Sequence, residues 1–134
     1  MGNTKISNII YPEEFKTNFI YVYLEYEDEL KRIIEQSGRK DEFIRKYRKT
    51  LLFLNNLKTN CIKQRKLFEK LKDCKDLYSI KLHGEINLRI LFAFMNYKNT
   101  NIAVLIYPFI EKNTKDYEDA ILLSTKRIKI LKDI

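Results

Sequence analysis

Residues 77–109 read LYSIKLHGEINLRILFAFMNYKNTNIAVLIYPF, and this stretch decides the fold. Three segments within it are apolar and β-branched or aromatic, as expected of strands: 77–82, 88–95 and 102–109. The residues between these segments are few and include the turn formers Gly and Asn. Short turns between successive strands predict an antiparallel three-stranded meander.

The residues before this meander predict one further strand and then helices. Residues 19–26 are aromatic and β-branched and predict a strand, whereas 28–36 predict a short helix. Residues 40–57 repeat apolar side chains at helical spacing, which predicts a longer helix with one buried stripe. Residues 62–72 predict a further helical turn or two.

A last helix is expected after the meander, with Asn113 or Thr114 as its cap. Its buried stripe is predicted to comprise Tyr117, Ala120, Ile121, Ser124, Ile128 and Leu131. The order is then strand, two or three helices, three strands and a helix. Because βαβ alternation is lacking, this order predicts an α+β fold in which an antiparallel sheet packs its helices on one face.

Length and composition predict one globular domain over residues 1–134. The chain is 45% hydrophobic and contains only three glycines and two prolines, so it shows no linker between domains. The longest apolar run, 102–110, is too short to span a bilayer, and the start shows no secretion signal. We therefore expect a cytoplasmic protein with no membrane partner.

Cysteine and histidine are scarce, which bears on metal binding. Cys61 and Cys74 lack the spacing of a zinc site, and His83 is the sole histidine. We expect no metal and no cofactor. One disulfide is possible, but free thiols in a reducing cytoplasm are favoured.

The positive charge is concentrated in the middle of the chain. The net charge is +8, and residues 39–75 hold 13 basic and 4 acidic side chains, whereas residues 1–38 hold 4 and 7. Such a block attracts polyanions, although a solvated basic face on helices gives the same pattern. Charge alone leaves these two interpretations open.

Two basic side chains interrupt the predicted strands. Strand alternation places Ser79 and Lys81 on one face, and Arg89 stands in an otherwise apolar strand. An unpaired arginine is costly to bury, so Arg89 faces either solvent or a partner. Phosphate-loop, HExxH and GxSxG motifs are lacking.

Residues 66–132 resemble the RelE/ParE toxin superfamily and are most similar to its HigB (Gp49-like) branch. The resemblance lies in four pieces that occur in the family's order: KLKD at 70–73 followed by LYSIKL at 77–82, NLRILFAF at 87–94, IYPFIEK at 106–112 and NTKDYEDAI at 113–121. The N-terminal half matches only in its order of strand and helices. Four residues depart from the family pattern: Lys81 where many HigB relatives have Arg though RelE-like members have Lys, Tyr107 where His is frequent, Glu111 where Lys is usual, and Tyr117 where Pro is common.

The resemblance implies a RelE-like fold and a metal-independent ribonuclease that cuts mRNA, in most relatives on the ribosome. Attack of a ribose 2′-OH on the adjacent phosphate needs a proton acceptor, a proton donor and positive charge on the phosphorane. We assign catalytic roles to Lys81, Arg89, Lys112 and Tyr117. We assign RNA binding to Lys115, Tyr107, Lys70 and Lys72.

The resemblance also implies partners. They are mRNA, the ribosome and a cognate antitoxin, which in this branch is typically a helix-turn-helix protein. Two alternatives stay open at this point. One is a ParE-like inhibitor of DNA gyrase that shares the fold but cuts no RNA. The other is a non-catalytic RNA-binding domain or an inactivated toxin.

Overall fold

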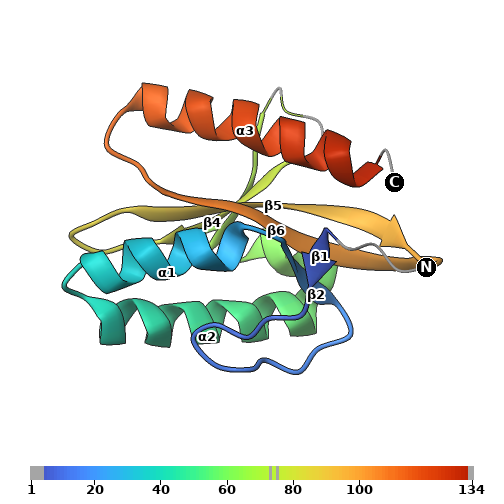
Figure 1. Cartoon of the computed structure of the whole chain (residues 1–134), viewed down its shortest axis with the longest axis horizontal. Coiled ribbons are helices and arrows are strands. Elements are labelled where there is room, and N and C mark those ends of the chain that lie inside the picture. The colour runs from blue at the N-terminus through green and yellow to red at the C-terminus, as the bar shows by residue number, and fades with distance from the viewer. Residues whose placement is uncertain (1–4, 73, 75, 133–134) are drawn as a thin grey trace.

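Figure 1 shows a computed structural model of the chain, which describes residues 5–72, 74 and 76–132. Helices and strands follow one another in this order: β1 (Ile6–Ser7), β2 (Ile20–Tyr23), α1 (Tyr26–Gln36), α2 (Lys40–Leu57), the 3-10 helix η1 (Lys58–Lys63), β3 (Phe68–Lys70), β4 (Tyr78–Leu82), β5 (Leu88–Tyr97), β6 (Thr100–Ile110) and α3 (Thr114–Lys132). The described residues confirm the α+β class.

The strands form one six-stranded sheet in the order β1-β2-β6-β5-β4-β3. The predicted meander is confirmed, because β4 pairs antiparallel with β5 and β5 antiparallel with β6. A two-residue turn joins β5 to β6, and both its residues, Lys98 and Asn99, have positive φ angles of 51° and 64°. Such turns match the twist of paired strands.

The prediction of a wholly antiparallel sheet is wrong. Strand β2 pairs parallel with β6, so the sheet is mixed. Since α1 and α2 lie between these strands in the chain, the long connection allows β2 to run alongside β6 in the same direction. The first strand is also shorter than the predicted 19–26, because α1 already begins at Tyr26.

The prediction that the helices share one face of the sheet is also wrong. Figure 1 shows α3 on one face and α1 and α2 on the other. The reason lies in the apolar runs of β5 and β6, where Ile90–Ala93 and Ile102–Ile106 are buried without interruption. Strands that are apolar on both faces require cover on both.

The segment 62–72 is not the predicted helix. Helix α2 ends at Leu57, and a 3-10 helix continues to Lys63 before the chain turns into the edge strand β3. Phe68 of β3 is buried and packs edge-on against Phe92 of β5, at a ring-centroid distance of 6.2 Å. Burial of this aromatic residue against the sheet favours a strand over the helical spacing of the sequence.

Helix α3 begins with the predicted cap. Asn113 Oδ1 accepts from the backbone N–H of Asp116, and Asp116 Oδ2 accepts from the N–H of Asn113. This reciprocal pair satisfies donors that the first turn leaves free. The predicted stripe is buried at Ala120, Ser124, Ile128 and Leu131 and half-buried at Tyr117 and Ile121.

Cys61 and Cys74 are free thiols, as favoured from the sequence. Cys61 is fully buried, and burial raises the pKa of its thiol from 9.0 to about 12. Within the described part of the chain, no helix is long and apolar enough to traverse a lipid bilayer.

Candidate functional site

Lys81 and Arg89 are direct cross-strand neighbours in the register of β4 and β5. Phe109 of β6 is opposite Arg89 on the other side, so the three side chains share one face of the sheet. This is the face that α3 covers, because the ring of Tyr117 on α3 contacts the ring of Phe109 edge-on at 5.2 Å. Strand alternation thus brings two predicted site residues together, and α3 adds a third.

Arg89 is held by a carboxylate. Its Nε donates to Glu111 Oε1 at 2.9 Å, and the Arg89 side chain is only 11% exposed. The other end of the guanidinium is different, because Nη1 is buried and has no hydrogen-bond partner among the described residues. A buried charged donor without an acceptor is costly, and such donors are typical of ligand sites.

The hydroxyl of Tyr117 is the second polar group in this region that is buried without a partner of ordinary geometry among the described residues. Burial is the main cause that raises its pKa above 10.0. The nearby Ser79 hydroxyl and the charge of Arg89 oppose that rise, whereas the carboxylates of Glu69 and Glu111 add to it. The phenol is therefore protonated at neutral pH and suits a proton donor.

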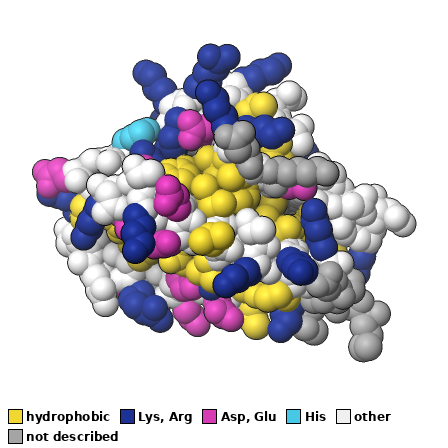
Figure 2. Space-filling view, turned by 90° about the horizontal axis from the view of Figure 1, so that it is seen from above, with side chains coloured by type: hydrophobic (Ala, Val, Ile, Leu, Met, Phe, Trp, Pro, Cys, Tyr) yellow, Lys and Arg dark blue, Asp and Glu magenta, His cyan; other side chains and the backbone are white. Residues whose placement is uncertain are grey.

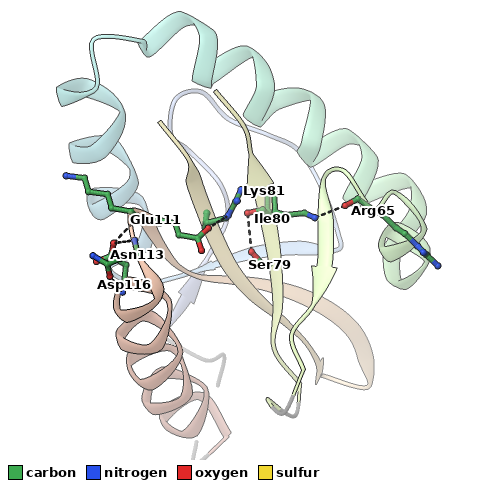
Figure 3. A network of polar contacts seen from close by, with 9 residues as sticks. Arg65, Ser79, Ile80, Lys81, Glu111, Asn113 and Asp116 are labelled. Carbon is green, nitrogen blue, oxygen red and sulfur yellow. Dashed lines mark hydrogen bonds and ion pairs between the residues drawn. The ribbon is translucent and has the colours of Figure 1, made fainter. Parts of the chain in front are cut away.

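Lys81 extends away from Arg89 towards the sheet edge. Its Nζ donates to the backbone carbonyl of Arg65 at 2.7 Å, and Figure 3 shows this contact on the far side of Lys81 from Glu111. Like charges opposite one another on a sheet repel. Here each of the two cations has an acceptor of its own, the Arg65 carbonyl for Lys81 and the Glu111 carboxylate for Arg89.

Lys112 and Lys115 lie at the start of α3 and are exposed. The N–H groups of Lys112 and Asn113 donate to Asp116 Oδ2 at 2.8 and 3.1 Å, as Figure 3 shows in part, so the chain itself fills this helix terminus. Lys112 precedes the helix and Lys115 lies two residues before Tyr117, so both are close to Tyr117 along the chain but do not share its side of the helix. We retain them as residues that can contact an RNA backbone.

Tyr107 is separated from Tyr117 by an intervening ring. It stacks on Phe109 at 6.1 Å, with 9° between the ring planes, and Phe109 in turn contacts Tyr117. The guanidinium of Arg127 covers Tyr107, with Cζ 5.3 Å from the ring centroid. The structure thus engages Tyr107 in packing, whereas the charge of Arg89 acts on Tyr117.

Lys70 and Lys72 lie at or just beyond the end of the edge strand β3, and both are exposed. Lys70 is opposite Tyr78 in the register, with its Nζ 6.0 Å from the centroid of that ring. It therefore lies on the other face of the sheet from Lys81.

A surface depression connects the two faces at this edge. Its volume is about 340 Å³, and its lining residues are Ile62, Arg65, Phe68, Glu69, Lys70 and Lys81. Another depression, of about 350 Å³, lies in the loop before β2 between Asn8 and Asn18 and includes none of the predicted site residues. Only the first of these two therefore extends the site.

Sequence reasoning missed Arg127, which is 5% exposed and the most heavily engaged side chain of α3. Its two terminal nitrogens donate to the two carboxylate oxygens of Glu29 at 2.7 Å each, and Nη1 also donates to the carbonyl of Ile106 at 2.8 Å. Arg127 lies three residues after Ser124 and seven after Ala120, which is the helical spacing of the buried stripe. This spacing could have identified it as a buried residue. Because arginine is charged, it was not included in the predicted stripe.

Figure 2 views the face that carries α3 and shows apolar side chains in the middle with Lys and Arg side chains, and some Asp and Glu side chains, around them. Among the described residues, no three or more His, Cys, Asp and Glu side chains are grouped so that they could hold a metal ion. What the site offers is a guanidinium, an ammonium and a protonated phenol. Together these groups can bind a phosphodiester, stabilise added negative charge and donate a proton.

Comparison of the chain with protein-family models, curated proteins and solved structures finds no match in any of the three.

Proposed function

We propose that this protein is a metal-independent RNA endonuclease of the RelE/HigB kind, the toxin of a type II toxin–antitoxin pair. The observation that carries the proposal is the register of β4 and β5, which places Lys81 directly opposite Arg89 on the face where the Tyr117 hydroxyl is buried. The order of motifs from 70 to 121 supports it. The partners would be ribosome-bound mRNA and a helix-turn-helix antitoxin, and the site of action the cytoplasm.

The proposed chemistry is an internal transesterification. The ribose 2′-oxygen attacks the adjacent phosphorus, the bond from phosphorus to the 5′-oxygen breaks, and a cyclic phosphate and a free 5′-OH result. Arg89 binds the phosphate, since a guanidinium matches its geometry. Tyr117, whose phenol is protonated at neutral pH, gives a proton to the leaving 5′-oxygen. Lys81, as an ammonium, stabilises the charge of the phosphorane, and the 2′-OH proton passes to solvent water.

One specific observation favours the alternative of a non-catalytic RNA-binding protein. Arg89 and Lys81 are both engaged, by the Glu111 carboxylate and the Arg65 carbonyl. Under the proposed function, substrate phosphate takes the place of Glu111 at Arg89. Under the alternative, the ion pair persists and RNA is bound only by the exposed lysines.

Expression of Arg89→Lys and Lys81→Ala beside wild type tests the proposal. Both variants are expected to abolish growth arrest and mRNA cleavage, and the cleavage is followed by primer extension. Lysine cannot form the bidentate contact with phosphate that Arg89 forms, and alanine lacks the positive charge of Lys81. Lys98→Ala is the matched control. Lys98 is exposed in the β5–β6 turn, nine residues along β5 from Arg89, or about 30 Å at strand rise.

Each outcome decides between the candidates. Folded Arg89→Lys and Lys81→Ala proteins that still cut RNA would show the site assignment to be wrong. Arrest by wild type without mRNA cleavage would favour gyrase inhibition. RNA binding by wild type without arrest or cleavage would favour the non-catalytic protein.

A further inference from the structure

The depression at the edge strand β3 adjoins the proposed site through one shared side chain. Lys81 belongs both to the cross-strand pair with Arg89 and to the lining of the depression. Its Nζ holds the backbone carbonyl of Arg65, which fixes the segment that forms the opposite wall. A ligand in the depression would therefore lie directly beside the reacting phosphate of the proposed function.

Arg65 and Lys70 of this wall have no carboxylate partner within the described residues. Arg65 is exposed, and its guanidinium has neither a hydrogen bond nor an ion pair within the described residues. Lys70 is exposed and contacts the face of the Tyr78 ring, so its charge is not neutralised by a carboxylate there. Elsewhere on the surface some basic side chains are paired, as Lys46 is with Glu42 and Arg39 with Glu85, whereas others such as Lys63 have no ion pair within the described residues. Cations left without carboxylates beside a concave surface are suited to phosphate.

The rest of the lining suits a base. Ile62 is 39% exposed and offers apolar surface for a flat ring, whereas Phe68 lies buried beneath it. Glu69 is the acidic member of the lining and repels a phosphate, which orients the phosphate towards Arg65 and Lys70. A volume of about 340 Å³ falls within the range of small-ligand sites.

We infer that this depression is a subsite for one nucleotide of single-stranded RNA next to the cleaved bond, with Arg65 and Lys70 on its phosphates and Ile62 against its base. The inference rests on the proposed function for the position of the cleaved bond. Binding in the subsite does not itself require cleavage. The bound strand runs from Arg89 past Lys81 and over the β3 edge.

The test measures binding of fluorescein-labelled 2′-O-methyl oligonucleotides, which lack the attacking 2′-OH and stay intact. Wild type, the double variant Arg65→Ala/Lys70→Ala and the control Lys31→Ala/Arg32→Ala are titrated with chains of two and four nucleotides by fluorescence anisotropy. The control removes the same charge from exposed positions on α1. Helix α1 packs near β6 and β2, away from the β3 edge of the sheet.

The expected result is a loss of about tenfold in affinity for the four-nucleotide chain in the Arg65→Ala/Lys70→Ala protein, and a change below about twofold in the control. Loss of two phosphate contacts to a single strand also makes the slope of log K against log salt concentration less steep by about 1.4. Ile62→Asn is expected to weaken binding with the salt slope unchanged, because it removes base contact and no charge.

Equal losses in the double variant and the control would overturn the inference, because binding would then follow the overall charge. Cleavage and binding that are insensitive to Arg65→Ala/Lys70→Ala would overturn it as well. If the double variant shows the expected binding defect but the wild-type protein does not cut RNA, the proposed function is overturned and the subsite still stands.

Discussion

Arg127 of α3 and Glu29 of α1 form a two-bond ion pair, with Nη1–Oε1 and Nη2–Oε2 distances of 2.7 Å each. The two residues are 98 positions apart in the chain and come from helices on opposite faces of the sheet. Glu25 lies 3.3 Å from the same guanidinium, and the ring of Tyr23 stacks over it at 4.8 Å. This pair ties α3, which carries Tyr117, to the first half of the chain.

Arg127→Ala is expected to lower the free energy of unfolding by about 3–5 kcal/mol, because it leaves Glu29 without its partner in a largely buried setting. Urea denaturation checks the value. Lys126→Ala is the control, since Lys126 is the exposed neighbour on the same helix and should change stability by less than about 0.5 kcal/mol. Similar losses in both variants would mean that the Arg127 pair contributes nothing specific.

The Tyr117→Phe variant distinguishes a role of the hydroxyl in catalysis from a role in stability. Its hydroxyl is buried without a hydrogen bond of ordinary geometry, so its removal should leave stability unchanged or slightly higher. Cleavage of RNA should nevertheless fall about 10²- to 10⁴-fold if the phenol is the proton donor. Thermal unfolding and initial cleavage rates are the measurements. An active Tyr117→Phe protein would remove Tyr117 from the mechanism.

Glu111→Gln tests whether Glu111 restrains Arg89. The neutral amide holds the guanidinium less strongly than the carboxylate does at 2.9 Å, so phosphate competes better for it. We expect affinity for a 2′-O-methyl oligonucleotide to rise about three- to tenfold. Glu118→Gln, at an exposed position on α3, removes the same charge and is expected to change affinity by less. Equal gains in both variants would indicate a general charge effect and not the release of Arg89.

The stability of the fold is expected to decline in alkali. Burial raises the pKa of Cys61 from 9.0 to about 12 and raises the pKa of Tyr26 well above 10.0. Both groups are therefore neutral in the folded chain at pH values where the unfolded chain has lost their protons. The contribution of these groups to stability is complete below pH 9. It is lost as the pH rises above their pKa values in the unfolded chain and towards their pKa values in the folded chain.

Urea unfolding from pH 7 to 10.5 measures this decline. Each group that stays protonated only in the folded state contributes a slope of about 1.4 kcal/mol per pH unit above its unfolded pKa. Cys61→Ala lowers stability at every pH through lost packing, but it should flatten the segment between pH 9 and 10. An unchanged slope in Cys61→Ala would show that the thiol is not the group that titrates.

The meander, helix α2 and the cap of α3 were predictable, because they follow from local periodicity and from turn and capping residues. The sequence also placed Lys81 and Arg89 on neighbouring strands, but the register that sets them opposite one another came from the structure. The mixed sheet, the two-sided cover and β3 were not, because they depend on which segments distant in the chain pack together. Phe68 shows this most clearly, since its helical spacing is overridden by a contact with Phe92. The ion pair of Arg89 with Glu111 also depends on how the chain turns between β6 and α3, which local sequence patterns do not predict.

The order of strands has a consequence for how the molecule behaves in concentrated solution. The two long, apolar strands β5 and β6 are interior, whereas the edges are β1 with two residues and β3 with three. Exposed strand edges recruit other chains through their free backbone groups, and short edges that carry charge resist this. Glu69 and Lys70 provide that charge at β3. The most aggregation-prone segments of the sequence are thus kept away from any partner strand outside the molecule.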